Sequence, residues 1–341
     1  MKKDLLKISK KKIEDKINEI LDKEIEKYSD NEFIKESIIE LKRLSSGGKR
    51  VRGYLVKLGA MLFGKDDDSY IDLAAALEIF QTAILIHDDI IDEADKRRGL
   101  ETINAKYKGH IGVSKAICIG DLGFFISYRI INNSNISKEL KDEITKIYSK
   151  TLHNTVNGEI IDVELPLKDI DYHKNMNDSI IYDIYLNKTA WYTIIGPILI
   201  GAASASASTE DKEKLTVMGS YLGIAFQIKD DLLGLYSTSS SMGKTLNDVK
   251  EGKQTIIYKY AIDHANCDEL KLIDKYYGNP NISAGETKMI ADLFEKLGAR
   301  RNAEKLELEY TNKGIQIINS MDVQNKDLFM EFANYLLKRD K

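Results

Sequence analysis

Residues 71–99 read IDLAAALEIFQTAILIHDDIIDEADKRRG, an almost uninterrupted apolar segment that ends in carboxylates and then in arginines. Good helix formers fill its first half, so the segment predicts a buried helix that carries charge at one end. Asp88 and Asp92 are four residues apart and would project from one helix face, about one turn from each other. Because two such carboxylates repel each other, a cation is expected between them, and oxygen-only ligands suit Mg²⁺.

A basic run, Lys96-Arg97-Arg98, follows these acids. An acidic cluster alone is also typical of a solvated helix end. Guanidinium groups, however, are the usual bidentate partners of phosphate. Carboxylates, a metal ion and arginines in one short stretch therefore predict a phosphorylated substrate.

The composition predicts an all-helical protein. Among 341 residues there are three prolines, and Leu/Ile/Lys/Glu-rich stretches alternate with short Gly/Asn/Ser/Asp punctuation. The formal net charge of -4, with lysines and acids interleaved, gives no support for nucleic-acid binding. Cys118 and Cys267 form neither a disulfide framework nor a zinc signature, which favours a reducing cytoplasm.

Two other stretches bear on targeting and membranes. Residues 1–28 alternate Lys with Glu and Asp, whereas transit peptides are poor in acids and signal peptides need an apolar centre. An amphipathic packing or dimer-covering helix is expected there. The apolar stretch 194–203, IIGPILIGAA, is too short to span a bilayer, and its small residues predict close helix packing. No integral membrane segment is expected.

Residues 45–53, SSGGKRVRG, predict a flexible turn that leads into an apolar helix. The glycines allow close backbone approach, and Lys49 and Arg52 would share one face of the helix. This pair is a candidate phosphate clamp, although basic loops of this size are often merely solvated. The GxxxxGK[ST] spacing of a P-loop is missing, so nucleotide binding is not indicated.

Six motifs in this order resemble those of the trans-polyprenyl diphosphate synthase family. They are GGKRVR at 47–52, LIHDDIIDEADKRRG at 85–99, GD at 120–121, NKTAWYT at 187–193, FQIKDDLLG at 226–234 and GKTLNDVKEGKQT at 243–255. The resemblance spans about residues 45–255 and implies a single all-α domain over 1–341. Its fold would be the isoprenoid synthase helical bundle around a central cavity, with the two aspartate motifs facing each other across the cavity mouth.

The resemblance also implies the reaction. An allylic diphosphate ionises, isopentenyl diphosphate adds to the cation, and a proton is lost. About three Mg²⁺ ions would accompany the bound diphosphate, since Mg²⁺ favours carboxylates combined with phosphate oxygens. A homodimer is expected, and the apolar helices within residues 111–131 are suited to its interface.

By the same similarity, particular residues receive roles. The implied metal ligands are Asp88, Asp92, Asp230 and Asp231. Catalytic roles fall to Asp88, Asp89, Asp92, Arg97, Lys188 and Asp230. Isopentenyl diphosphate would be held by Lys49, Arg52 and Arg98. The allylic diphosphate would contact Arg97, Gln81, Lys188, Thr189, Gln227 and Lys244, with Lys253 as a further candidate.

Three positions depart from the family pattern. Gln81 stands where many relatives have His, and its amide can still donate to phosphate. Gly234 replaces the third aspartate of the second motif, so Asp230 is expected to carry most of the ligation there. Glu159 stands where relatives often have Gln and is expected to be structural or to support the site indirectly. Asp248 could orient a neighbouring lysine.

Product length in this family depends on side chains of the first acidic helix that reach into the pocket. Ala83 and Ile84 lie five and four residues before Asp88, and Phe80 lies one turn below Ala83. The small Ala83 predicts room for more than a farnesyl chain, with Phe80 either as the floor or as ordinary core packing. Geranylgeranyl diphosphate is the expected product, and a C25 or longer chain or farnesyl diphosphate is the alternative.

Other classes fit less well. A terpene cyclase should carry an NDxxSxxxE-type second motif, but residues 230–238 read DDLLGLYST, and the Lys49/Arg52 clamp would have no purpose. That clamp also disfavours a head-to-head condensing enzyme. A non-catalytic regulatory subunit would be expected to have lost the first aspartates, which are all present.

Overall fold

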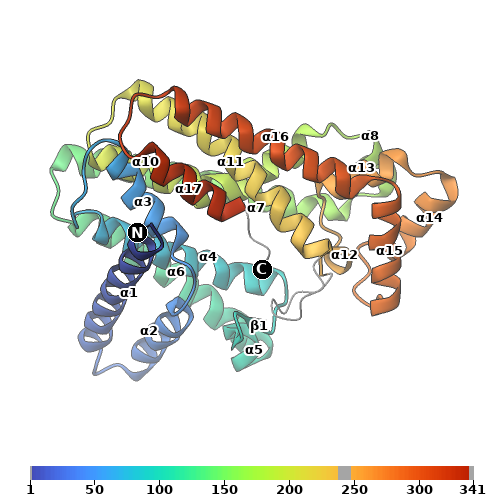
Figure 1. The fold of residues 1–341 in the computed structure, drawn as a ribbon. Coiled ribbons are helices and arrows are strands. Elements are labelled where there is room, and N and C mark those ends of the chain that lie inside the picture. The colour runs from blue at the N-terminus through green and yellow to red at the C-terminus, as the bar shows by residue number, and fades with distance from the viewer. Residues whose placement is uncertain (1, 237–246, 338–341) are drawn as a thin grey trace. The chain divides into compact units, whose positions relative to one another are not determined.

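The computed structural model describes residues 2–236 and 247–337, and these are mostly helical (Figure 1). The α-helices are α1 (Lys2–Lys27), α2 (Glu32–Ser45), α3 (Val51–Leu62), α4 (Ile71–Ile91), α5 (Ile103–Tyr107), α6 (Gly109–Asn133), α7 (Lys138–Glu164), α8 (Ile170–Asn175), α9 (Ser179–Ile184), α10 (Gly196–Ser204), α11 (Thr209–Tyr236), α12 (Asn247–Glu251), α13 (Ile256–His264), α14 (Cys267–Tyr276), α15 (Ala284–Lys296), α16 (Ala299–Ser320) and α17 (Lys326–Leu337). A 3-10 helix, η1 (Leu165–Leu167), and a π-helix, η2 (Tyr185–Ile195), interrupt this series. Strands β1 (Lys96–Arg97) and β2 (Leu100–Glu101) form a short antiparallel hairpin. The predicted all-α class is confirmed.

The chain divides into two compact units, each assembled from separate stretches of sequence. Unit 1 comprises residues 1–149, 196–212 and 323–328, and unit 2 comprises 150–195, 213–322 and 329–341. Helices α7 and α11 each begin in unit 1 and end in unit 2. The single domain over 1–341 stays a prediction.

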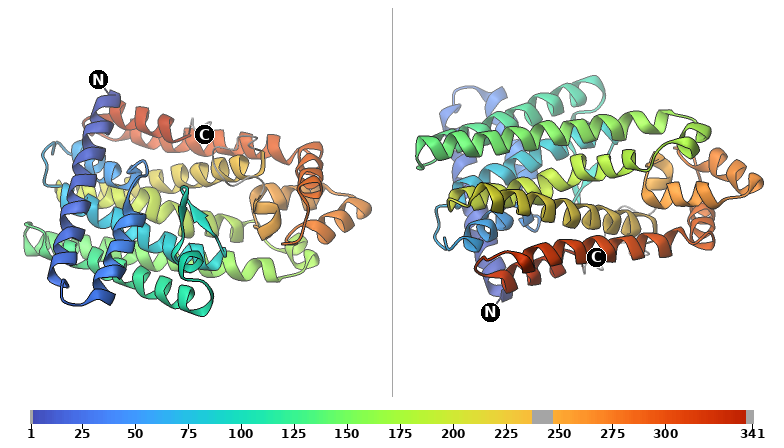
Figure 2. Two further views of the ribbon diagram at one scale, coloured as in Figure 1. Left: turned by 90° about the horizontal axis from the view of Figure 1, so that it is seen from below. Right: turned by 90° about the horizontal axis from the view of Figure 1, so that it is seen from above.

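Unit 1 is built around α4. The helix is apolar on most sides because α1, α3 and α6 pack against it, and this accounts for the nearly continuous apolar run in its sequence. Helix α1 buries Ile13, Ile17 and Leu21 and packs on α2 and α4, so the predicted amphipathic packing helix is confirmed (Figure 2). Helices α3 and α10 cross closely: a Cβ at Gly201 would lie 2.0 Å from the Val56 carbonyl oxygen, as the small residues of 194–203 predicted.

Unit 2 has its own apolar core. Side chains of α9, α11, α13, α15 and η2 form one continuous cluster that includes Ile228, Ile257 and Phe294. Helix α16 runs alongside α11 (Figures 1 and 2), where Gly314 contacts Leu222. This packing fixes α11 and η2, the two elements that carry the second group of predicted site residues.

Within the described residues, one helix, α6, is long and apolar enough to cross a membrane by length and composition alone. Of its most apolar window, 39% is buried, and core helices of soluble proteins can be equally long and apolar. One side of α6 packs on α4, and the other exposes Ile111, Ile117 and Phe125. The absence of a membrane segment stays a prediction.

Candidate active site

The acidic end of α4 carries the first group of predicted site residues. Asp88 lies in the last turn of the helix, and Asp92 is its C-cap residue. The backbone N–H of Asp92 donates to the carbonyl oxygen of Asp88, so the two residues are one helical turn apart, as their spacing predicts. Asp89 is 2% exposed and points into unit 1.

Arg97 joins two of these acids. Its Nη2 donates to Oδ2 of Asp88 and its Nε to Oδ1 of Asp89, both at 2.5 Å. Burial lowers the pKa of Arg97, but the two carboxylates outweigh it and leave the pKa raised. The β1–β2 hairpin positions Arg97, and positive φ angles at Arg98 (54°) and Gly99 (79°) close its two-residue turn. The sequence predicted these groups but not their ion pair.

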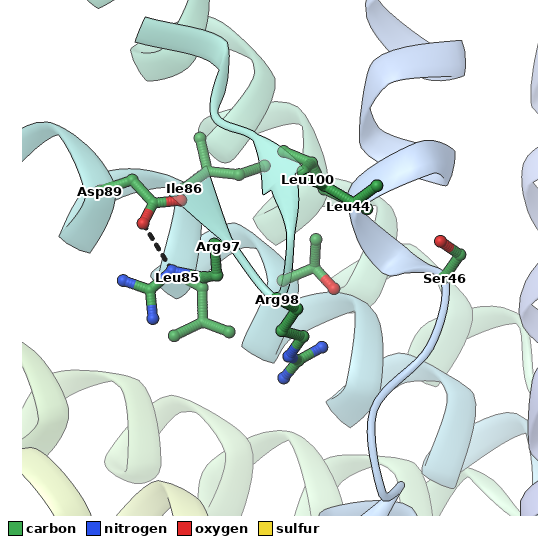
Figure 3. Close-up of a pocket in the computed structure, with 9 residues that line it drawn as sticks. Leu44, Ser46, Leu85, Ile86, Asp89, Arg97, Arg98 and Leu100 are labelled. Atoms are coloured by element: carbon green, nitrogen blue, oxygen red, sulfur yellow. Dashed lines mark hydrogen bonds and ion pairs between the residues drawn. The ribbon is translucent and has the colours of Figure 1, made fainter. Parts of the chain in front are cut away.

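A pocket lies beside this ion pair (Figure 3). Its lining residues are Leu44, Ser46, Thr82, Leu85, Ile86, Asp89, Arg97, Arg98 and Leu100. In Figure 3 the Nε atom of Arg97 reaches Asp89, whereas the guanidinium group of Arg98 points away from Asp89. The two consecutive arginines therefore have different surroundings, and their separate roles stay predictions.

A buried carboxylate fixes the basic loop before α3. Glu78 of α4 accepts a hydrogen bond from the backbone N–H of Gly53 at 2.8 Å and pairs with Arg50 Nη1 at 3.5 Å. Arg50 itself has a positive φ of 53° and a buried side chain. Of the two predicted clamp residues, Arg52 is buried and Lys49 is exposed. Glu78 thus anchors the junction between the loop that carries Lys49 and the first turn of α3, which carries Arg52.

Arg98 and Arg52 lie close enough to repel each other. Burial lowers the pKa of Arg98, and the positive charge of Arg52 lowers it further. Arg52 is buried and Arg98 is exposed, and two like charges this close are stabilised when an anion binds between them. The isopentenyl diphosphate clamp of Lys49, Arg52 and Arg98 stays a prediction.

The predicted chain-length residues lie along α4. Phe80 is 1% exposed, and its ring centroid is 5.6 Å from that of Phe124 and 5.4 Å from that of Tyr148. Ala83 lies against α6, where a Cβ added at Gly123 would be 2.9 Å from the Cβ of Ala83. Close helix packing is therefore a second reason for a small residue at Ala83. Ile84 and Gln81 are both half-buried, and the roles of all four residues stay predictions.

In unit 2, Lys188 is held by two carboxylates of α7. Its Nζ donates to Glu159 at 3.0 Å and to Asp162 at 2.5 Å, and all three side chains are roughly four-fifths buried. Gly158 makes this possible, because a Cβ there would lie 2.1 Å from the backbone nitrogen of Lys188. The expectation that Glu159 supports the site indirectly agrees with this contact, whereas Asp162 was not singled out.

A hydrogen-bond network connects η2 with α11. Thr189 Oγ1 donates to Gln227 Oε1 at 2.5 Å, and Gln227 Nε2 donates to Asp231 Oδ1 at 2.8 Å. The hydroxyl of Tyr185 donates to the other oxygen of Asp231. Burial raises the pKa of Asp231 well above its usual range, the nearby Asp248 adds to this, and the two hydrogen bonds oppose it. Both carboxylate oxygens of Asp231 thus have protein partners.

The rest of the second acidic motif lies next to Asp231. Asp230 is partly exposed. A Cβ at Gly234 would be 2.4 Å from Oδ2 of Asp248, so this carboxylate occupies the space beside the glycine. Lys253 pairs with Glu251 at 3.0 Å. Lys244 lies outside the described residues.

Sequence reasoning did not find three residues that hold predicted site residues in place, namely Glu78 in unit 1 and Asp162 and Tyr185 in unit 2. Each contacts a residue at least 25 positions away. Glu78, an acid inside the apolar run of α4, was the one detectable signal, because buried carboxylates need partners. Asp162 and Tyr185 carry no comparable signal.

Comparisons with known proteins indicate the family of this chain. The polyprenyl synthetase family profile matches residues 36–294. Geranylgeranyl diphosphate synthase of Sulfolobus acidocaldarius is 30% identical over 87% of this chain and 88% of its own length. Short chain isoprenyl diphosphate synthase of Methanocaldococcus jannaschii is 30% identical over 83% of this chain and 81% of its own length.

A solved structure is similar along nearly the whole chain. The geranylgeranyl pyrophosphate synthase of Corynebacterium glutamicum, complexed with isoprenyl diphosphate and magnesium, superposes with a TM-score of 0.88. The two sequences are 26% identical, and the match covers 96% of this chain and 97% of the other. The ordered motifs, the helical fold and the extent of this similarity place the chain in the polyprenyl synthetase family of prenyltransferases.

Proposed function

We propose that this prenyltransferase joins isopentenyl diphosphate to an allylic diphosphate, head to tail and in the trans configuration, with geranylgeranyl diphosphate as its product. The observation that carries the proposal is the convergence of Asp88, Asp92 and Arg97 at the end of an apolar helix. Relatives named as geranylgeranyl and short chain isoprenyl diphosphate synthases support it.

The first step is cleavage of the allylic C–O bond, during which negative charge grows on the leaving diphosphate. Fixed cations stabilise this charge most effectively where little water is present. Arg97 and Lys188 are suited to this role because both are largely buried. Each is held by two carboxylates, so the diphosphate would compete with those carboxylates for the cation.

The allylic cation must then meet isopentenyl diphosphate before it meets water. The residues that precede the acids on α4 are apolar, as a water-poor pocket requires. Arg52 and Arg98, with Lys49, would hold isopentenyl diphosphate, whose double bond attacks the cation. The released diphosphate can accept the proton that is lost, so no dedicated protein base is needed.

Magnesium fits the oxygen ligands that this chain offers. Asp88 and Asp92 present carboxylates one turn apart, and Mg²⁺ completes its coordination with water and phosphate oxygens. Bound Mg²⁺ would neutralise charge on the leaving diphosphate. Asp230 is better placed as a ligand than Asp231, whose oxygens both accept hydrogen bonds from the protein. We include about three ions in the proposal. Each would be bound by one or two carboxylates together with phosphate oxygens of the substrate, which is the usual mode of Mg²⁺ binding.

We further infer a homodimer formed through α6. The helix exposes five large apolar side chains on the side away from α4: Ile111, Val113, Ile117, Phe125 and Tyr128. An exposed apolar face of this kind is typical of a two-fold interface. We also expect a cytoplasmic location, and both cysteines are free and exposed in the described structure.

The test is to incubate the purified chain with Mg²⁺, isopentenyl diphosphate and, separately, dimethylallyl, geranyl and farnesyl diphosphates. A discrete geranylgeranyl product that Asp88→Ala abolishes, and that the matched control Asp95→Ala retains, would support the proposal. Asp95 is a nearby exposed acid. Longer products would still support elongation but would refute Phe80 as the floor of the product pocket. Cyclisation or no consumption of isopentenyl diphosphate would refute elongation.

A further inference from the structure

Tyr185 makes two hydrogen bonds to groups outside its own helix. It begins η2, three residues before Lys188, and is 2% exposed. Its hydroxyl donates to Oδ2 of Asp231 on α11 and accepts from the backbone N–H of Ile256 at 2.9 Å. A phenolic hydroxyl can donate one hydrogen bond, and Tyr185 donates it to Asp231.

Tyr185 is one end of a ladder of hydrogen bonds between η2 and α11. Tyr185 and Thr189 are four residues apart on η2, and Gln227 and Asp231 are four residues apart on α11. Tyr185 bonds to Asp231, Asp231 to Gln227, and Gln227 to Thr189. The ladder fixes both the carboxylate plane of Asp231 and the orientation of the Gln227 amide.

The same hydroxyl reaches a third segment. Ile256 is the first residue of α13, so its N–H has no acceptor within that helix. Tyr185 supplies this acceptor and thereby fixes the end of the segment that carries Lys253. One buried hydroxyl thus ties together η2, α11 and the approach to α13, and each carries residues of the proposed site.

We propose that Tyr185 is a positioning residue for prenyl transfer, which holds Asp231 turned into unit 2 so that Asp230 is presented to the metal-bound diphosphate. This inference rests on the proposed function. Neighbouring residues of an α-helix point about 100° apart, so fixing Asp231 also fixes the direction of Asp230. Their exposure agrees: Asp231 is 5% exposed, and Asp230 is partly exposed.

The test compares Tyr185→Phe with the matched control Tyr182→Phe. Tyr182 lies three residues earlier, its ring centroid is 6.3 Å from that of Tyr185, and its hydroxyl bonds to Tyr310 rather than to a carboxylate. Binding of inorganic pyrophosphate in the presence of Mg²⁺ is measured by calorimetry on the full-length chain. Tyr185→Phe should weaken binding about tenfold, the scale of one hydrogen bond to a carboxylate, and Tyr182→Phe should not.

Kinetics separate positioning from a general loss of folding. Tyr185→Phe should lower kcat about tenfold and raise the Mg²⁺ concentration needed for half-maximal rate, while KM for isopentenyl diphosphate changes less than about twofold. In an Asp231→Asn background, Tyr185→Phe should cause no further loss, because the tyrosine acts through that carboxylate. Thermal unfolding of each variant records any effect on stability.

The outcomes are distinct. If wild type elongates and Tyr185→Phe matches it in pyrophosphate binding and kcat, the positioning role is wrong while the proposed function stands. Equal losses in Tyr182→Phe, or additive losses with Asp231→Asn, would also overturn it. If wild type binds no pyrophosphate and consumes no isopentenyl diphosphate, the proposed function fails and this inference with it.

Discussion

Replacing Gly158 by alanine should destabilise the protein and impair Lys188. Gly158 lies inside α7, against the backbone of η2. An added Cβ would lie 2.1 Å from the Lys188 nitrogen, 2.6 Å from its Cα and 2.8 Å from the carbonyl carbon of Asn187, whereas ordinary contact begins at 3.4 Å. The two helices would therefore have to separate by about an ångström, because backbone atoms cannot rotate away.

Two effects of this change oppose each other. Alanine favours a helix interior over glycine by at most about 1 kcal/mol. Overpacking costs about 1–3 kcal/mol and more when the neighbouring atoms cannot move. We expect the free energy of unfolding to fall by about 2 kcal/mol, which lowers Tm by several degrees. Because Lys188 and Thr189 would move with η2, kcat should fall as well.

The matched control is Gly285→Ala on α15, where an added Cβ meets no atom within 4 Å. It isolates the helix-propensity effect and should leave Tm unchanged or slightly raised. Thermal unfolding by circular dichroism and product formation are measured for both variants. If Gly158→Ala is as stable and as active as Gly285→Ala, the close approach of α7 and η2 is wrong.

Three further changes test neighbouring features. Glu159→Gln keeps an acceptor for Lys188 but removes a negative charge, whose repulsion of a nearby diphosphate is worth about 1 kcal/mol. KM for the allylic substrate should therefore fall severalfold, and a higher KM would contradict this. Gly234→Ala would place a methyl group 2.4 Å from Oδ2 of Asp248, so product formation across a Mg²⁺ titration should drop, and an unchanged titration curve would refute that placement. Burial lowers the pKa of His173 below the ordinary histidine value of about 6.5, so the unfolded chain binds more protons and the free energy of unfolding should decline as pH falls below about 6.5. Urea unfolding at pH 7 and pH 5 should show a smaller decline for His173→Gln than for the wild type, and equal declines would exclude this histidine as the cause.

Local patterns predicted the parts of the site that depend on spacing along one helix. Asp88 and Asp92 are one turn apart because any α-helix places residues four apart on one face. The helix itself was predictable because α4 is packed on most sides and its sequence is correspondingly apolar. Motif order then identified the family, which the comparisons confirm.

Contacts between distant segments were not predictable in the same way. Nothing in the spacing of Tyr185 indicates that its hydroxyl meets a carboxylate 46 residues later. The π-helix η2 was also missed, because its apolar residues fit an ordinary buried helix equally well. Arg97 was expected to contact diphosphate, but its pairing with Asp88 depends on a hairpin whose strands have two residues each.

The two cations proposed for the allylic diphosphate are each held in the same way. Arg97 is shared by Asp88 and Asp89, and Lys188 by Glu159 and Asp162, so each cluster has two carboxylates for one cation. Such clusters repel a free diphosphate, and a divalent ion reverses the local charge. Pyrophosphate should therefore bind at least about a hundredfold more weakly after chelation of Mg²⁺ with EDTA, since reversing a unit charge at close range is worth several kcal/mol. Calorimetric titrations with and without EDTA measure this directly. Equal affinity in the two titrations would mean that Arg97 and Lys188 exchange their carboxylates for pyrophosphate without a metal ion. That result would contradict the argument, because each cation is outnumbered by two carboxylates that repel the anion.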